Sequence, residues 1–121
     1  MNMKNIKKDI LKVATNRGRK EILKNNIVSC KQFSFGSAIY LNDGTHFLMK
    51  ERIPELRTIL VSERFFIVDE DTMINIKYVD AIMPNYLLMS NGERFMLSEQ
   101  RRKAFFERIN KFFELDYNLQ T

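Results

Sequence analysis

The stretch Arg64–Ile76, RFFIVDEDTMINI, decides the fold of this chain. Its first half, Phe65–Val68, is apolar, and its second half, Thr72–Ile76, is rich in β-branched residues. Both halves are typical of strands with a buried face. The stretch therefore predicts two strands around an exposed tip, and loops held by rigid strands commonly carry function. The tip consists of three consecutive acids: Asp69, Glu70 and Asp71.

Strand-like runs continue outward from this stretch in both directions. We expect them at residues 10–15, 20–23, 27–33, 38–41, 45–50, 78–83, 86–90 and 93–97. Turn residues separate these runs, with Asn16–Arg19 and Asn42-Asp43-Gly44 as examples. Asn91-Gly92 predicts a type I′ turn, which requires positive φ at both residues. The pattern predicts a mostly β fold of about ten short strands.

Two segments change to helical spacing. Residues 51–60 predict a short helix with Pro54 in its first turn. Ser98 is a suitable N-cap for a final helix to about Leu115, in which Phe105, Ile109 and Phe112 form one apolar face. We read these aromatic residues as core packing. The sequence divides into a basic N-terminal tail (1–9), one domain (10–115) and a C-terminal tail (116–121).

The composition suits one globular domain. The chain has 121 residues, of which 45% are hydrophobic, so it can bury a single core. Its apolar runs are too short to span a membrane, and its basic start has no apolar signal segment. Cys30 is the only cysteine, which suits a reducing compartment. We therefore expect a cytoplasmic protein without a membrane partner.

The positive charge is concentrated near the two ends of the chain. The net charge is +5. Residues 1–24 carry eight Lys or Arg and two acids, and residues 98–111 carry five and two, whereas residues 25–97 carry seven and nine. Basic blocks suit a polyanion such as nucleic acid. They also suit a solvated surface that keeps the protein soluble, and charge alone leaves both readings open.

No constellation typical of an enzyme is evident. His46 is the only histidine and has no nucleophile in a recognisable context, and Cys30 reads as a small core residue. One cysteine and one histidine cannot build a standard zinc site. The acids at positions 69–71 could bind a hard cation, but adjacent strand residues alternate faces and lack calcium-loop spacing. We expect no enzymatic activity, cofactor or metal.

Several words in this sequence, taken in order, resemble the LytTR-type DNA-binding domain of bacterial regulators. They are NRGRKEIL (16–23), YLNDG (40–44), ERIPEL (51–56), RFFIV (64–68), MINIKYVDAI (73–82), LLMSNGERFMLS (87–98) and RRKAFFERI (101–109). The resemblance covers residues 10–113. It implies an elongated β fold whose loops enter successive major grooves of double-stranded DNA. Family members usually follow a receiver domain or a membrane segment, and neither is evident here, so we expect a stand-alone version.

The sequence departs from the family pattern in the short motifs that contact DNA in this family, which we call the contact words. The word after the double Phe is typically Arg-x-His-Arg/Lys-Ser, whereas here those places hold Ile67, Asp69, Glu70 and Asp71. Carboxylates facing phosphates repel them, and phosphate contacts supply much of the affinity for DNA. The last word, usually Ser-Arg-Arg, reads Ser98-Glu99-Gln100.

The candidate DNA-contact residues follow from this resemblance and from the basic ends. Gln100 could read adenine in bidentate fashion. The others are cations or members of the first contact loop. The full set is Gln100, Arg101, Arg102, Lys103, Lys31, Phe35, Ser37, Arg17, Arg19 and Lys20.

Two functional hypotheses remain open from the sequence. In the first, the protein is a sequence-specific transcription regulator that binds DNA with an altered preference. In the second, direct DNA contact is impaired, and the acidic loop at 69–71 binds a protein partner with a basic surface. Edge strands could also support a homodimer.

Overall fold

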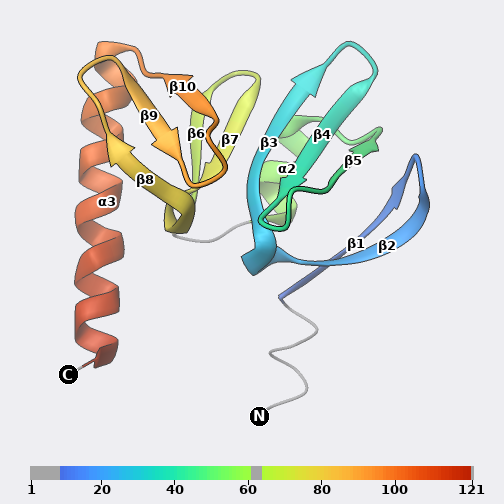
Figure 1. The fold of residues 1–121 in the computed structure, drawn as a ribbon, viewed down its shortest axis with the longest axis horizontal. Coiled ribbons are helices and arrows are strands. Elements are labelled where there is room, and N and C mark those ends of the chain that lie inside the picture. The colour runs from blue at the N-terminus through green and yellow to red at the C-terminus, as the bar shows by residue number, and fades with distance from the viewer. Residues whose placement is uncertain (1–8, 61–63, 121) are drawn as a thin grey trace.

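The computed structural model of the protein describes residues 9–60 and 64–120, the last eight of them by backbone alone. The described chain is mostly β, with ten strands, two α-helices and two short 3-10 turns (Figure 1). The fold class is therefore confirmed. The strands are β1 (Ile10–Thr15), β2 (Gly18–Leu23), β3 (Ile27–Phe33), β4 (Gly36–Leu41), β5 (His46–Met49), β6 (Phe65–Asp69), β7 (Thr72–Asn75), β8 (Val79–Ile82), β9 (Tyr86–Met89) and β10 (Arg94–Met96). The helices are α2 (Ile53–Ile59) and α3 (Glu99–Gln120), and the 3-10 turns are Lys24–Asn26 and Ile76–Tyr78.

The strands form three antiparallel sheets. The largest has the order β5-β4-β3-β7-β6, so the two strands of the stretch 64–76 are its last two. Phe65 pairs with Asn75 and Ile67 pairs with Met73, and a bulge follows Ile67. Strands β1 and β2 form a separate hairpin, and β8, β9 and β10 form a three-stranded sheet.

Each face of the five-stranded sheet covers its own core. On one face, Cys30 and Met73 pack with Leu11 of the β1–β2 hairpin and Leu56 of α2. On the other face lie Phe66, Ile74 and residues from the three-stranded sheet and α3. Those residues are Leu87, Met89, Phe95, Phe105 and Ile109. Because side chains alternate along a strand, β6 and β7 contribute to both cores.

A buried amide fixes the end of β7. The Asn75 side chain is fully buried, donates through Nδ2 to the Ile27 carbonyl at 2.9 Å and accepts from the Lys77 N–H at 3.0 Å. A buried polar group needs such partners because water cannot reach it. These bonds end the strand and begin the 3-10 turn at Ile76, so β7 is one residue shorter than predicted.

The turn at Asn91-Gly92 differs from the type I′ turn predicted above. Gly92 has φ +89°, but Asn91 is not among the residues with positive φ. The Gly92 N–H donates to the Met89 carbonyl, and the Met89 N–H donates to the Glu93 carbonyl. This is the three-residue loop in which a type I turn precedes a left-handed glycine, and only the glycine needs φ > 0.

The two α-helices occur where the spacing predicts them. In α2, Pro54 occupies the first turn, and Ile53 and Leu56 are buried. Helix α3 begins after Ser98, whose Oγ accepts from the Arg101 N–H at 3.2 Å. It continues to Gln120, so most of the segment interpreted as a C-terminal tail is helical. Within the described residues, neither helix has the length and apolar character needed to cross a membrane.

Candidate nucleic-acid interface

Three loops from distant parts of the sequence lie at one end of the molecule. Figure 1 shows the β3–β4 turn, the β6–β7 tip and the start of α3 at this end, with α3 running away from it. We call it the loop end, made of residues 33–36, 69–71 and 96–103. The Gln32 N–H donates to the Asp71 carbonyl at 2.8 Å, which joins the first two loops. The family resemblance places its contact words on these three loops.

The β3–β4 turn presents two aromatic rings to solvent. Phe33 is 43% exposed and Phe35 is 54% exposed, and their rings stack with centroids 5.5 Å apart and planes 10° apart. Arg52 holds the turn from outside, since its guanidinium donates to the Ser34 carbonyl at 2.8 Å. The turn is thus a supported apolar platform. Ser37 is fully buried, and its Oγ has no hydrogen-bond partner among the described residues, so this predicted contact residue is not at the surface.

The β6–β7 tip exposes all three acids. Asp69 also has a structural role, because its Oδ1 accepts the Asp71 N–H at 2.8 Å and closes the turn. Asp71 lies near Gln32, whose Nε2 is 3.5 Å from Oδ1. Glu70 forms no such bond within the described residues. In residues 9–60 and 64–112, no group of three His, Cys, Asp or Glu side chains could hold a metal ion.

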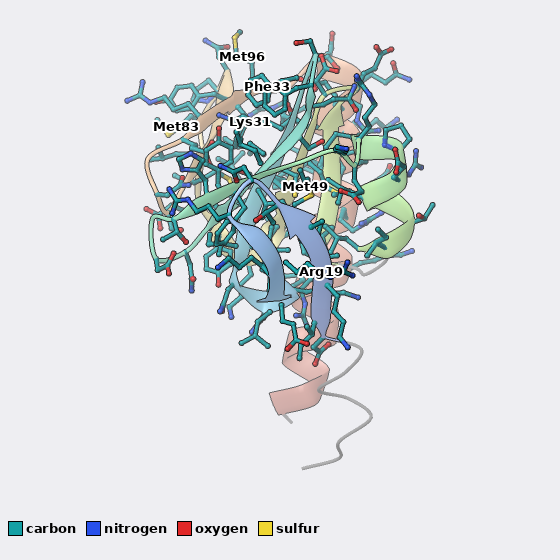
Figure 2. The ribbon with its side chains drawn as sticks, turned by 90° about the vertical axis from the view of Figure 1, so that its right-hand side faces the viewer. Arg19, Lys31, Phe33, Met49, Met83 and Met96 are labelled. Carbon is teal, nitrogen blue, oxygen red and sulfur yellow. The ribbon has the colours of Figure 1, made fainter. Side chains whose placement is uncertain are left out.

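The start of α3 adds polar and apolar side chains to the loop end. Gln100 and Lys103 are exposed, and Met96, just before the helix, is 77% exposed. Figure 2 shows Met96 and Phe33 toward the same end of the molecule. Phe33, Phe35 and Met96 thus give the loop end exposed apolar side chains from two separate loops.

Arg101 and Arg102 are engaged within the protein. Arg101 donates through Nε and Nη2 to the Ile67 carbonyl, at 3.1 and 2.5 Å, and its guanidinium lies 4.6 Å from the centre of the Phe66 ring. Arg102 donates to the carbonyls of Met83 and Pro84 at 3.0 and 2.7 Å. Both keep their charge, but these bonds fix the side chains against the neighbouring strands. They can still attract phosphates at longer range.

Lys31 is also held by an ion pair. Its Nζ lies 2.7 Å from Glu93 Oε2, between the rings of Tyr40 and Phe95 at 5.0 and 5.2 Å. Glu93 belongs to the loop between β9 and β10, so the pair joins the five-stranded sheet to the three-stranded one. Lys31 therefore positions the sheets behind the loop end.

The Glu93 carboxylate is stabilised in its ionised form. Burial would raise the pKa of Glu93, but hydrogen bonds from Lys31, Asn91 and Ser29, together with the Lys31 charge, outweigh burial and hold that pKa below its usual value. The Oε1 atom accepts from Ser29 Oγ and Asn91 Nδ2, both at 2.7 Å. A carboxyl whose pKa falls on folding stabilises the protein above its unfolded pKa.

We expect Glu93→Gln to reduce the free energy of unfolding by about 1–2 kcal/mol at pH 7, because it removes a charged acceptor of three donors. Since the folded pKa is depressed, the difference from wild type should be complete above about pH 4.5. It should shrink as the pH falls through the folded pKa. Urea denaturation from pH 3 to pH 7 measures it, with Glu55→Gln on the exposed face of α2 as control. An equal difference at every pH would contradict the assignment.

The cations of the β1–β2 hairpin lie apart from the loop end. Arg17 and Lys20 approach the ring of Phe47 on β5, at 6.0 and 5.7 Å from its centre. Figure 2 shows Arg19 far from Met96 and Phe33 along the molecule. The loop end therefore does not include these three predicted contact residues, which form a separate basic surface.

The surroundings of Cys30 and His46, the two residues considered for catalysis, indicate structural roles. Cys30 is fully buried, and burial, followed by the negative charge of Glu93, raises its pKa to about 12. A thiol that stays protonated is a poor nucleophile. His46 is exposed, and its ring stacks on Tyr40 at 5.7 Å.

Sequence reasoning missed four residues that shape the loop end. The sequence pattern places Phe33 and Met96 in strands, which is correct, but it does not indicate that their side chains are exposed at the strand ends. Arg52 and Gln32 support the loops through bonds to residues 18 to 39 positions away. No local pattern could have indicated those partners.

The chain is similar to known DNA-binding domains. The family model of the LytTr DNA-binding domain matches residues 20–110. A search of solved structures finds the LytTr DNA-binding domain of a protein described as a putative methyl-accepting/DNA response regulator from Bacillus cereus. The two folds superpose with a TM-score of 0.72 over 84% of this chain and 96% of that one, at 17% sequence identity. No curated protein matches.

Proposed function

The chain belongs to the LytTR family of DNA-binding domains, and we propose that it is a transcription regulator that recognises a specific double-stranded DNA sequence through its loop end. The observation that carries this proposal is that the three loops in the places of the family's contact words lie at one end of the molecule (Figure 1). Loops on a rigid β scaffold can enter a major groove in place of a recognition helix.

The individual side chains suggest how the loop end would bind. Gln100 and Lys103 are exposed at the start of α3, beside the exposed Glu99, so Gln100 would contact a base edge and Lys103 a phosphate. The stacked rings of Phe33 and Phe35 would contact thymine methyl groups or the sugar backbone. Arg101 and Arg102 would contribute charge from fixed positions. Arg17 and Arg19 would reach phosphates only if the DNA extends along the hairpin side.

We expect the protein to bind DNA with an affinity that falls steeply as the salt concentration rises. Fluorescence anisotropy with a labelled random-sequence duplex, measured between about 50 and 200 mM salt, gives the slope of log K against log salt. Lys103→Gln should reduce the magnitude of that slope by about one, because one phosphate contact is lost. Lys77→Gln, an equal charge change on the 3-10 turn after β7, should leave the slope unchanged.

Absence of binding at about 50 mM salt would overturn the proposal, since non-specific affinity is greatest at low salt. Sequence preference needs a second measurement. Repeated selection from a random duplex library should enrich one motif, and Gln100→Ala should relax the preference at one position of that motif. Enrichment of no motif would leave only non-specific binding.

The exposed acids favour a second candidate function. Asp69, Glu70 and Asp71 stand beside the apolar surface of Phe33 and Phe35. A mixed acidic and apolar surface is complementary to a basic protein surface, such as that of a DNA-binding relative. In this case the domain would bind that partner and restrain it. The variant that separates the two candidates is argued in the Discussion.

A further inference from the structure

A cavity lies beyond the loop end, between the end of α2, strand β6 and the middle of α3. Its volume is about 610 Å³, within the range of small-molecule sites. Among the described residues that line it, Glu107 is the only acid. The lining also includes four cations: Arg57, Arg101, Arg108 and Lys111. The positive charge therefore exceeds the negative charge by three.

Apolar side chains also line the cavity: Leu60, Phe65 and Met73 are among them, and each is buried. Apolar side chains contact the hydrocarbon part of a ligand, whereas cations bind an anionic group. Only a ligand with both parts would use the whole cavity.

Two of the cations are fixed by the edge of β6. Arg108 donates through Nη1 to the Phe65 carbonyl at 2.8 Å, and Arg101 donates to the Ile67 carbonyl. A guanidinium has five N–H donors, so each arginine has donors left for a carboxylate or phosphate. Arg57 and Lys111 are exposed and have no hydrogen-bond or ion-pair partner among the described residues.

Edge protection explains only part of this arrangement. β6 is the last strand of the sheet, and an open strand edge is commonly covered by charged side chains. That accounts for Arg101 and Arg108, which bind the edge carbonyls. It accounts neither for Arg57 and Lys111 nor for the unfilled space between the helices.

We propose that this cavity binds a small amphiphilic anion, meaning a carboxylate or phosphate monoester that carries an apolar chain or ring. The apolar part would lie on Leu60, Phe65 and Met73, and the anionic group would be held by Arg57, Arg108 and Lys111. Such a ligand would act as an effector, because Arg101 also holds the Ile67 carbonyl, two residues before the acidic tip. This last step rests on the proposed function.

Octyl phosphate is a suitable probe, and amide shifts in two-dimensional NMR report where it binds. We expect saturable shifts in α2, β6 and the middle of α3. Octanol has the same chain without the charge, and inorganic phosphate has the charge without the chain. Each should bind at least about tenfold more weakly. Equal binding of octanol, or shifts confined to the loop end, would overturn the site.

Two matched double variants test the cations. Arg57→Gln/Lys111→Gln removes two charges from the lining of the cavity, and Arg19→Gln/Lys50→Gln removes two exposed charges elsewhere. The first should raise the Kd for octyl phosphate about tenfold or more, the loss expected for a charge-assisted hydrogen bond. The second should change it less than twofold. Equal weakening in both variants would show a general charge effect and contradict the site.

A separate measurement tests whether the bound anion changes the affinity for DNA. DNA affinity should change at least threefold when wild type is saturated with octyl phosphate, and it should not change in Arg57→Gln/Lys111→Gln. An unchanged affinity in wild type would overturn the effector role. If the protein binds no DNA without the probe, the proposed function fails, while the NMR titration still decides the anion site.

Discussion

Gly36→Ala should destabilise the protein by about 3 kcal/mol or more, the largest effect expected of any single substitution at the loop end. Gly36 has φ +147°, which L side chains rarely adopt. A Cβ there would overlap the Met49 carbonyl oxygen and lie 2.9 Å from the Lys50 Cα. Both are backbone atoms, so the β4–β5 region would have to move.

Urea denaturation of Gly36→Ala measures this effect, and Gly44→Ala is the matched control. Gly44 also has positive φ, at +89°, but an added Cβ there meets no atom within 4 Å. The control should lose only about 1 kcal/mol, from backbone strain. A loss in Gly36→Ala no greater than that in Gly44→Ala would show that the close contact with Met49 is unimportant.

Neutralising the acidic tip should raise the affinity for DNA on the order of tenfold at about 50 mM salt. The variant is Asp69→Asn/Glu70→Gln/Asp71→Asn. In the proposed complex these three carboxylates would face phosphates, so removing them would remove a repulsion that is screened only over about 10 Å. These replacements are preferable to alanine, because an amide oxygen at position 69 can still accept the backbone N–H of position 71, which closes the turn in wild type.

A matched control removes three exposed acids elsewhere: Glu55→Gln/Asp80→Asn/Glu107→Gln. Its DNA affinity should rise less, since those carboxylates lie outside the loop end. Unchanged affinity in the tip variant, or an equal rise in both, would contradict direct contact of the tip with DNA.

The same variant separates the two candidate functions. If the tip binds a basic protein partner, a partner captured by wild type and by the control should be lost from the tip variant. Retention of that partner by the tip variant would remove the second candidate. A tip variant that gains DNA affinity and loses no partner would support the regulator.

The local pattern of the sequence predicted most of the fold. Alternating apolar residues indicated the strands, and the glycines at 44 and 92 indicated the turns, because both depend on neighbours within a few residues. An observed strand boundary differs from the predicted one where a contact between residues distant in sequence intervenes. Asn75 ended β7 early through its bond to Ile27, 48 residues away. The turn at Asn91 differed because three-residue and two-residue loops share the same residue types.

The candidate site was less predictable than the fold. The family words indicated which loops would meet, and the structure places them at one end. Which side chains remain available there depended on partners distant in sequence. Arg101 is held by Ile67, Lys31 by Glu93, and Ser37 is buried.

The sequence by itself therefore determined the strands, the helices and the acidic character of the β6–β7 tip. These features follow from residue type and from spacing along the chain. Only the tertiary structure decided that the cations beside the tip are bound to backbone carbonyls and to Glu93, and that stacked Phe rings stand exposed next to it. The physical reason is that a hydrogen-bond donor takes whichever acceptor packing brings within reach, and packing joins residues that are far apart in the chain.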